Sequence, residues 1–289
     1  MSHAETHRVP NQRVPVRLQE YGVGVFKAIM TKSALKKALK KAYITVDNVT
    51  ATTATFISGG EEITLTLPDK KTSGKKFHYS CHILFEDAYL AVIRKPPGIR
   101  VSGNHFKTIA NALPQCIQAS EVDDAIKPQP VHRLDYATTG VLLIGKTNSS
   151  IRKLNALFQN RVVTKTYYAV TIGKMKDSGE IKSDIEGKVS LSRYTLLQSA
   201  PSKRFGQLNL VQLYPETGRR HQLRIHMSEM GNPILGDPNY GTEGLVLKGK
   251  GLYLHAHSLK FTHPFTEEYL CITDTLPQKF KKIFPEIAV

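Results

Sequence analysis

The chain has 289 residues, of which 40% are hydrophobic, so it is long enough to fill one large core and one small one. Forty Lys and Arg residues oppose 24 Asp and Glu residues, and the formal net charge of +16 points to a polyanionic partner. No apolar run approaches the roughly 18 residues of a membrane span, and the N-terminal segment lacks the apolar core of a secretory signal. The composition therefore favours a nucleic acid over a membrane surface, and we expect a soluble cytoplasmic protein.

The cysteines support the same compartment. Cys81, Cys116 and Cys271 are too few and too scattered for a disulfide framework or a zinc site. A reducing cytoplasm fits this usage.

The N-terminal part begins with an expected tail over residues 1–13, followed by a small domain over residues 14–68. Within it, the sequence TKSALKKALKKA from Thr31 to Ala42 has its apolar residues on one face, which predicts a helix capped by Thr31 or Ser33. Four lysines occupy the opposite face and are candidates for RNA phosphate contacts: Lys36, Lys37, Lys40 and Lys41. A solvated helix face is the alternative for these lysines.

After this helix, residues 43–67 alternate between apolar and polar positions and are broken at Asp47-Asn48 and Ser58-Gly59-Gly60. The pattern predicts short strands joined by turns. The helix and strands together form a small α+β unit.

A charged, turn-rich linker is expected over residues 69–78, and a second domain over residues 79–289. The sequence HILFEDAYLAVIRKPPG predicts two strands separated by Glu86-Asp87. Residues 117–130 carry acidic residues and prolines without a clear period, so we expect a loop there.

The stretch VHRLDYATTGVLLIGK, from Val131 to Lys146, is the most informative in the chain. Asp135 lies two residues after Arg133, and turn-forming residues precede an apolar run over residues 141–144 that reads as a buried strand. An aspartate beside Thr and Gly often only caps a turn. Alternatively, Asp135 is a functional carboxylate that the neighbouring buried strand holds rigidly in place.

Beyond this stretch, Ser149 or Ser150 is expected to begin a helix whose apolar residues lie on one face. The segment KTYYAVTIG then reads as a strand in which Tyr167 and Tyr168 point to opposite faces. Residues 179–214 suggest further antiparallel strands.

The sequence ETGRRHQLRIHMSEMG, from Glu216, is expected to form a helix that ends at Gly231. Arg220 and Arg224 would then lie one turn apart. The predicted fold class is α+β, with a mixed, mainly antiparallel sheet flanked by helices and preceded by the small α+β domain.

The string HRLD followed by ATTG resembles the nucleophile motif of the RluA-type pseudouridine synthases, with Thr139 where the family has Ser. Further segments resemble the same family in the same order, from Tyr79 to the end of the chain: RKPPGIRVSG, KTYYAVTIG, ETGRRHQLRIH, GNPILGDPNYG and LHAHSLKFTHP. Arg94 is the clearest departure, because the family more often has Asn there. The resemblance implies the pseudouridine synthase fold.

The resemblance also implies an activity, the isomerisation of uridine in RNA to pseudouridine. Asp135 would be the nucleophile and Arg224 its partner, since an ionised carboxylate is favoured by a neighbouring arginine. Tyr167 corresponds to the active-site tyrosine, whose ring can stack on the target base. The family uses neither a metal nor an organic cofactor, and we expect a monomer.

Several basic residues around these motifs are candidates for RNA binding: Arg133, Lys165, Arg219 and Arg220. Arg133 could fill the stack that the target base leaves, or contact a phosphate. The small domain resembles the RNA-binding module named after the small-subunit ribosomal protein S-four. This likeness favours large-subunit ribosomal RNA as the target, with transfer RNA as the alternative.

Two other classes stay open. A non-catalytic RNA-binding or ribosome-assembly factor would explain the charge. A glycoside or nucleoside hydrolase would explain a nucleophilic aspartate, but such a hydrolase needs a second carboxylic acid about 5 to 10 Å away. The histidines His132, His221 and His226 have no metal-binding spacing around them, so no metal site is expected.

Overall fold

The computed structural model describes residues 3–29, 31–68, 77, 79–247 and 249–287. The chain divides into two compact units, Met1–Lys75 and Lys76–Val289. The linker expected over residues 69–78 lies outside the described residues, apart from Phe77. No helix among the described residues is long and apolar enough to cross a bilayer.

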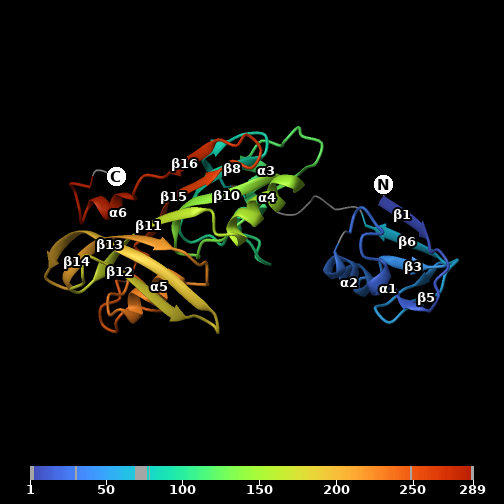
Figure 1. Cartoon of the computed structure of the whole chain (residues 1–289), viewed down its shortest axis with the longest axis horizontal. Coiled ribbons are helices and arrows are strands. Elements are labelled where there is room, and N and C mark those ends of the chain that lie inside the picture. The colour runs from blue at the N-terminus through green and yellow to red at the C-terminus, as the bar shows by residue number, and fades with distance from the viewer. Residues whose placement is uncertain (1–2, 30, 69–76, 78, 248, 288–289) are drawn as a thin grey trace. The chain divides into compact units, whose positions relative to one another are not determined.

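The small unit is built on a four-stranded sheet in the order β1-β6-β3-β4 and a second sheet that pairs β2 with β5 (Figure 1). Its elements are β1 (His3–Arg8), β2 (Val16–Arg17), α1 (Leu18–Tyr21), α2 (Lys32–Lys40), β3 (Ile44–Val46), β4 (Val49–Thr50), β5 (Phe56–Ile57) and β6 (Glu62–Leu67).

Helix α2 forms where the apolar spacing predicts it, and its N-cap is Thr31, whose side chain accepts a hydrogen bond from the Ala34 amide. Leu35, Ala38 and Leu39 are buried in the core of the unit. The helix ends earlier than expected, because Ala42 lies beyond it with a positive φ of 55°.

The separate tail expected over residues 1–13 is wrong for its first part. Strand β1 pairs antiparallel with β6 along its whole length, from His3 opposite Leu67 to Arg8 opposite Glu62. The strand sequence HAETHR has no apolar alternation, so no pattern marks it. Its backbone hydrogen bonds to the edge of β6 hold it in the sheet.

The large unit contains one mixed sheet with the strand order β12-β13-β14-β11-β15-β10-β8-β7, while β16 pairs with β15 and β9 with β10. Only β10 and β15 run parallel among the described pairs, so the expected mainly antiparallel sheet is confirmed. The strands are β7 (His82–Glu86), β8 (Leu90–Lys95), β9 (Ala125–Pro130), β10 (Thr139–Thr147), β11 (Thr164–Ile172), β12 (Ser178–Asp184), β13 (Val189–Ser202), β14 (Gly206–Pro215), β15 (Leu254–Thr262) and β16 (Tyr269–Thr273).

Helices flank this sheet. The helices are α3 (Ile109–Cys116), α4 (Asn148–Gln159), α5 (Gln222–Glu229) and α6 (Gln278–Lys281). Figure 1 shows α3 and α4 beside β8 and β10, and α5 beside β12 and β13. The N-cap of α4 is Thr147, which forms a reciprocal capping box with Ser150, so the helix begins one residue before the expected Ser149.

Strand β10 is buried on both faces, as its apolar run predicts. Leu142 and Ile144 point into one core cluster, and Val141 and Leu143 into another. At its start Gly140 has a φ of 112°, and a Cβ there would lie 2.0 Å from the backbone oxygen of Ala256. Only glycine therefore allows β10 to approach β15 at the point where the Asp135 segment ends.

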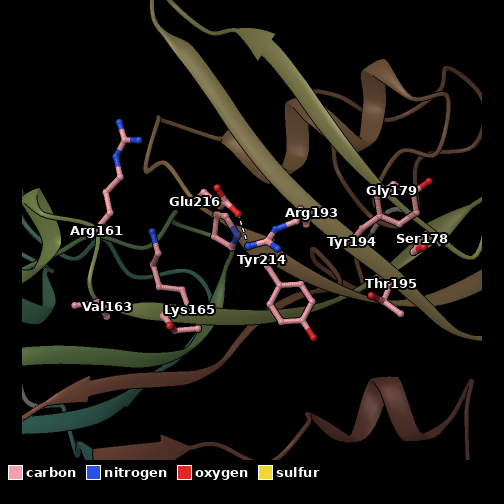
Figure 2. A pocket seen from close by; sticks show the side chains of 12 residues that line it. Arg161, Val163, Lys165, Ser178, Gly179, Arg193, Tyr194, Thr195, Tyr214 and Glu216 are labelled. Carbon is pink, nitrogen blue, oxygen red and sulfur yellow. Dashed lines mark ion pairs between the residues drawn. The ribbon is translucent and has the colours of Figure 1, made fainter.

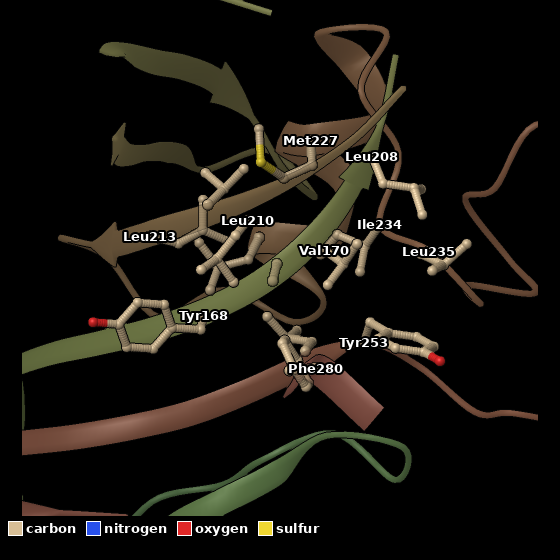
Figure 3. Close-up of a cluster of buried hydrophobic side chains, with 14 of the residues drawn as sticks. Tyr168, Val170, Leu208, Leu210, Leu213, Met227, Ile234, Leu235, Tyr253 and Phe280 are labelled. Carbon is tan, nitrogen blue, oxygen red and sulfur yellow. The ribbon is translucent and has the colours of Figure 1, made fainter. Parts of the chain in front are cut away.

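The largest core cluster lies under the other half of the sheet, where β11 and β14 meet α5 (Figure 3). Tyr168, Val170, Leu210 and Leu213 come from the strands, and Met227 comes from the helix. This packing fixes α5 against the sheet, and so fixes the position of the residues just before it.

Two expectations for the large unit are wrong. Part of the loop expected over residues 117–130 is strand β9, an edge strand that pairs with β10 and tolerates its two prolines because it lies at an edge. Cys81 and Cys116 form a disulfide, although the sequence argued against a disulfide framework. The 35-residue separation between them hid the pairing, which the fold brings about by laying α3 close to the start of β7.

Candidate active site

One pocket of about 480 Å³ gathers all seven predicted site residues of the large unit. Its lining comes from the segment around Asp135, from the start of β11 and from the segment before and into α5. The predicted residues that line it are Arg133, Asp135, Lys165, Tyr167, Arg219, Arg220 and Arg224. Segments far apart in the sequence thus converge on one cavity.

The Asp135 segment is held from behind by Lys95, which the sequence did not single out. The fully buried Lys95 Nζ donates to the backbone oxygens of Pro96, Tyr136 and Thr138 at 2.8, 3.2 and 2.8 Å. Burial lowers the pKa of Lys95 to about 8, while Asp135 opposes that shift. One ammonium therefore ties the turn after Asp135 to the end of β8.

Arg224 has two carboxylate neighbours. Its Nε and Nη2 donate to the two oxygens of Asp237 at 2.7 and 2.8 Å, and its Nη1 lies 3.4 Å from Asp135 Oδ2. Burial alone would raise the pKa of Asp237, but the hydrogen bonds from Arg224 and the Asn239 amide outweigh burial and hold that pKa below its usual range. The predicted pair of Asp135 and Arg224 is thus a triad with Asp237.

His221 lies on the other side of Asp135. Its Nε2 is 3.8 Å from Asp135 Oδ1, and its Nδ1 is 3.0 Å from the Tyr240 hydroxyl. Burial lowers the pKa of His221, and Asp135 opposes the shift, so the imidazole is mainly neutral at pH 7. Sequence reasoning considered His221 only as a metal ligand and missed this position.

The helix expected from Glu216 begins only at Gln222, so the preceding residues form a loop that lines the pocket. Buried Gln222 holds this loop: its Oε1 accepts from the Thr217 hydroxyl and the Arg219 amide, and its Nε2 donates to β13 at Leu191. Residue 221 has a left-handed φ of 56°. Arg220 and Arg224 therefore do not lie one helical turn apart, as the sequence suggested.

Tyr167 and Tyr168 point to opposite faces of β11, as predicted. Tyr168 is 5% exposed, packs in the core cluster of Figure 3, and its hydroxyl accepts from Gln212. Tyr167 lines the pocket, where burial, and secondly Asp135, raise its pKa. Its hydroxyl therefore stays protonated at neutral pH.

The basic side chains around the pocket lack acidic partners. Within the described part of the chain, no hydrogen bond or ion pair engages the side chains of Arg133, Arg161, Lys165, Arg219 and Arg220. The Nε of Arg219 is buried, and none of the described residues supplies an acceptor for it. Glu216 is the other carboxylate among the described lining residues, and it pairs with Arg193. Such cations suit phosphate groups supplied by a ligand.

Thr139, which replaces the serine of the family motif, contacts a buried histidine. Thr139 Oγ1 and His255 Nδ1 are 2.8 Å apart, and His255 Nε2 lies 3.6 Å from Asp274 Oδ2. Arg94, the other departure from the family pattern, donates through Nε to Asp274 Oδ1 at 2.6 Å. The two departures therefore belong to one network behind the pocket.

The other two histidines considered as metal ligands have different surroundings. His132 Nε2 accepts from the Leu143 amide at 2.9 Å and its ring stacks on Phe158. Both ring nitrogens of His226 are buried, and no hydrogen-bond partner engages them among the residues that the structure describes. Among the described residues, no group of three or more His, Cys, Asp or Glu side chains is arranged to hold a metal ion.

In the small unit, Lys36, Lys37 and Lys40 line one surface hollow of about 560 Å³ with Lys32. Lys41 lies just after α2, with its Nζ 5.6 Å from the centre of the Tyr43 ring. Three of the four predicted lysines therefore share one surface, and the fourth is directed toward an aromatic ring.

Comparison with known proteins supports the likeness drawn from the motifs. Residues 89–229 match the family described as RNA pseudouridylate synthase. The chain is 29% identical to ribosomal large subunit pseudouridine synthase C of Rickettsia felis, over 96% of this chain and 98% of the relative. It is 31% identical to ribosomal large subunit pseudouridine synthase D of Buchnera aphidicola, over 78% of this chain and 80% of the relative.

A solved structure shares the fold over most of the chain. Human RNA pseudouridylate synthase domain containing 4 superposes with a TM-score of 0.57 at 28% identity, covering 69% of this chain and 90% of that one. The expected pseudouridine synthase fold is confirmed. The chain belongs to the RluA-type family of RNA pseudouridine synthases, which are isomerases.

Proposed function

We propose that the chain converts uridine to pseudouridine in large-subunit ribosomal RNA, with Asp135 as the nucleophile. The observation that carries the proposal is the position of Asp135, in a pocket where Arg224 Nη1 lies 3.4 Å away and uncompensated cations form the rim. The two relatives described above are both named for the ribosomal large subunit. This agreement favours that RNA over transfer RNA.

The reaction is an isomerisation that balances without a cofactor. The bond from ribose C1′ to uracil N1 breaks, a bond from C1′ to C5 forms, and a proton leaves C5 while N1 gains one. Asp135 attacks as a carboxylate, and Arg224 orients it because Arg224 is itself fixed by the two oxygens of Asp237. No carboxylic acid poised as a proton donor is required, unlike in a glycoside hydrolase.

Tyr167 serves as the stacking surface for the target uracil, and its protonated hydroxyl is a hydrogen-bond donor beside Asp135. The target base must leave its stack to enter the pocket, at a cost of a few kcal/mol that phosphate contacts offset. Arg133, which is exposed on the pocket rim, either fills the vacated stack or binds a phosphate. Lys165, Arg219 and Arg220 hold the RNA backbone.

The small unit serves as an S-four-like RNA-binding domain, and the large unit is the catalytic domain. Support for this division comes from the lysine surface of α2 and the compactness of each unit. We further propose that the enzyme acts as a monomer, in the cytoplasm, where ribosomal RNA is found. The Cys81–Cys116 disulfide is unusual for that compartment and would be reduced or transient there.

The test is to map pseudouridines in total RNA from cells with and without this gene, and in large-subunit RNA and transfer RNA treated with the purified chain. We expect a small number of large-subunit positions to depend on the gene and to be formed by the purified chain. Dependence of transfer RNA positions alone would contradict the proposed target while leaving the chemistry intact.

A further inference from the structure

A second pocket of about 650 Å³ adjoins the active-site pocket of the large unit (Figure 2). The two share four lining residues, which form the boundary between them: Arg161, Lys165, Pro215 and Glu216. The remaining lining comes from Val163 and the start of β11, from β12 and β13, and from the end of β14. Apart from the shared Lys165, the proposed isomerisation uses no residue of this second pocket.

The boundary is electropositive. Neither Arg161 nor Lys165 has a hydrogen bond or ion pair through its side chain within the described part of the chain. Burial, and secondly the nearby Arg161, lower the pKa of Lys165, so the two cations repel one another in a partly desolvated place. An anion between them would relieve that repulsion, and it would touch both pockets.

The second pocket also offers an aromatic surface. Figure 2 shows the half-buried Tyr214 between Lys165 and Thr195, with the ion pair of Arg193 and Glu216 beside it. Tyr214 comes from β14, where it lies opposite Arg193 of β13, so its backbone position is fixed by the sheet. A half-exposed tyrosine on a rigid strand beside free cations is the arrangement that stacks a base of single-stranded RNA.

The ion pair between Arg193 and Glu216 leaves the free positive charge at the boundary and not inside the second pocket. Arg193 is 61% exposed, but Glu216 compensates its charge, whereas Arg161 and Lys165 stay uncompensated. A phosphate is therefore attracted to the boundary rather than to the interior of the second pocket. The interior is left to Tyr214 and its neighbours on β12 and β13.

We propose that the second pocket binds the nucleotide adjacent to the target uridine, with its base on Tyr214 and the linking phosphate between Arg161 and Lys165. This inference rests on the proposed function, since it requires the target uridine in the first pocket. It makes Tyr214 a determinant of binding and of sequence context, not of chemistry.

The test uses a short RNA that contains the mapped uridine, and two versions that lack the base on its 5′ or its 3′ side. Filter binding gives the Kd of each for the full-length wild type, Tyr214→Ala and Tyr214→Phe. For the wild type, removal of one of the two flanking bases should weaken binding roughly 5- to 100-fold. On the intact RNA, Tyr214→Ala should raise the Kd by the same factor. On the RNA that lacks this flanking base, Tyr214→Ala should bind as the wild type does, because the substitution and the missing base remove the same contact.

Tyr214→Phe should retain most of the affinity, which separates stacking from misfolding. Tyr269→Ala is the matched control, because Tyr269 is 68% exposed on β16 and lines neither pocket. Two results would show that the second pocket is not a nucleotide site. In the first, Tyr214→Ala binds the intact RNA as the wild type does. In the second, the affinity lost through Tyr214→Ala adds fully to the affinity lost through removal of either flanking base.

The phosphate part of the proposal has its own measurement. Arg161→Gln and Lys165→Gln should each reduce the dependence of log K on log salt by about 0.7 for single-stranded RNA. Arg152→Gln, an exposed arginine on α4 outside both pockets, should leave the slope unchanged. An unchanged slope for both boundary variants would overturn this part. Failure of the proposed function is distinguishable, because the wild type would then not convert the uridine at all.

Discussion

Arg224 is bound more tightly by Asp237 than by Asp135: two hydrogen bonds of 2.7 and 2.8 Å join it to Asp237, whereas its Nη1 lies 3.4 Å from Asp135. Asp237 is fully buried and also accepts from the amides of Asn239 and Tyr240. The arginine is therefore fixed before RNA binds, and Asp135 meets a guanidinium whose direction is already set. Preorganisation of this kind suits the role of nucleophile that we propose for Asp135.

Asp237→Asn is expected to reduce activity without abolishing it. The substitution removes a charge from the bidentate pair and leaves the 5%-exposed Arg224 partly uncompensated, which costs about 3 to 5 kcal/mol of stability. Single-turnover rates should fall by roughly 10- to 1000-fold, a loss intermediate between the wild type and an enzyme without its nucleophile. Thermal unfolding measured in parallel separates the two effects.

Arg224→Lys is the companion variant, because Lys keeps the charge but lacks the planar fork that spans both oxygens of Asp237. It should recover part of the rate that Arg224→Ala loses. Equal rates for Arg224→Lys and the wild type would show that orientation by the fork is unimportant.

The lysine surface of the small unit should contribute to RNA affinity. Changing Lys36, Lys37, Lys40 and Lys41 to Gln should weaken binding and flatten its salt dependence by roughly 0.7 to 0.9 log unit per lost contact. The single-turnover rate at saturating protein should stay the same. Because Lys41 lies apart from the hollow that the other three line, it should contribute the least.

The control for these lysines is the double variant Lys174→Gln and Lys176→Gln, which removes two exposed charges from the large unit outside both pockets described above. The slope of log K against log salt is compared per lysine replaced. If it changes as much in this control as in the α2 variant, the helix has no special role in RNA binding.

Acid should destabilise the large unit through His255, which is 1% exposed. Burial lowers its folded-state pKa to about 4, while Asp274 opposes the shift. Between the ordinary histidine pKa near 6.5 and about 4, the unfolded chain takes up a proton that the folded chain does not. The contribution of His255 to the free energy of unfolding should therefore be fully present above about pH 6.5. It should fall by up to roughly 3 kcal/mol as the pH drops to about 4.

Urea unfolding at several pH values tests this. His255→Gln should reduce the dependence between pH 6.5 and 4 without removing it, because burial lowers the pKa of His132 to about 4 as well, and His82→Gln, which changes an exposed histidine, should leave it unchanged. The same acid dependence in His255→Gln as in the wild type would contradict the assignment.

Activity should survive treatment with a chelator, because the sequence has no metal-binding spacing and the isomerisation balances without a metal. Single-turnover rates with and without a chelator, in a buffer where the RNA remains folded, measure this directly. Loss of activity that added zinc restores would overturn the expectation.

The sequence predicted strand β10, helix α2 and the convergence of Asp135, Tyr167 and Arg224, because each sits in a local pattern or in a motif of the family. It could not reveal β1, whose polar sequence shows no apolar alternation and whose pairing with β6 and side-chain contacts to Lys27, Ala28 and Tyr21 arise only in the folded unit. The role of Asp237 was likewise hidden, although it stands in the quoted string GNPILGDPNYG. Its function arises from a contact with Arg224 that only the folded chain creates.

The start of helix α5 was predicted wrongly, at Glu216 instead of Gln222. Its periodicity continues backward through Arg220, but Gln222 turns its side chain to bind Thr217 and Arg219, and those tertiary bonds override the helical pattern. A loop at this place is what lets Arg219 and Arg220 reach the pocket. Local propensity could not foresee it.

The most direct test of the account is the rate of pseudouridine formation by Asp135→Asn under single-turnover conditions, with RNA binding measured on the same protein. Asn keeps the size and polarity of the side chain but removes the carboxylate, so pseudouridine should fall to background while RNA affinity stays within about tenfold of the wild type, or 1.4 kcal/mol. Conversion by Asp135→Asn at an appreciable fraction of the wild-type rate would contradict the assignment of Asp135 as the nucleophile.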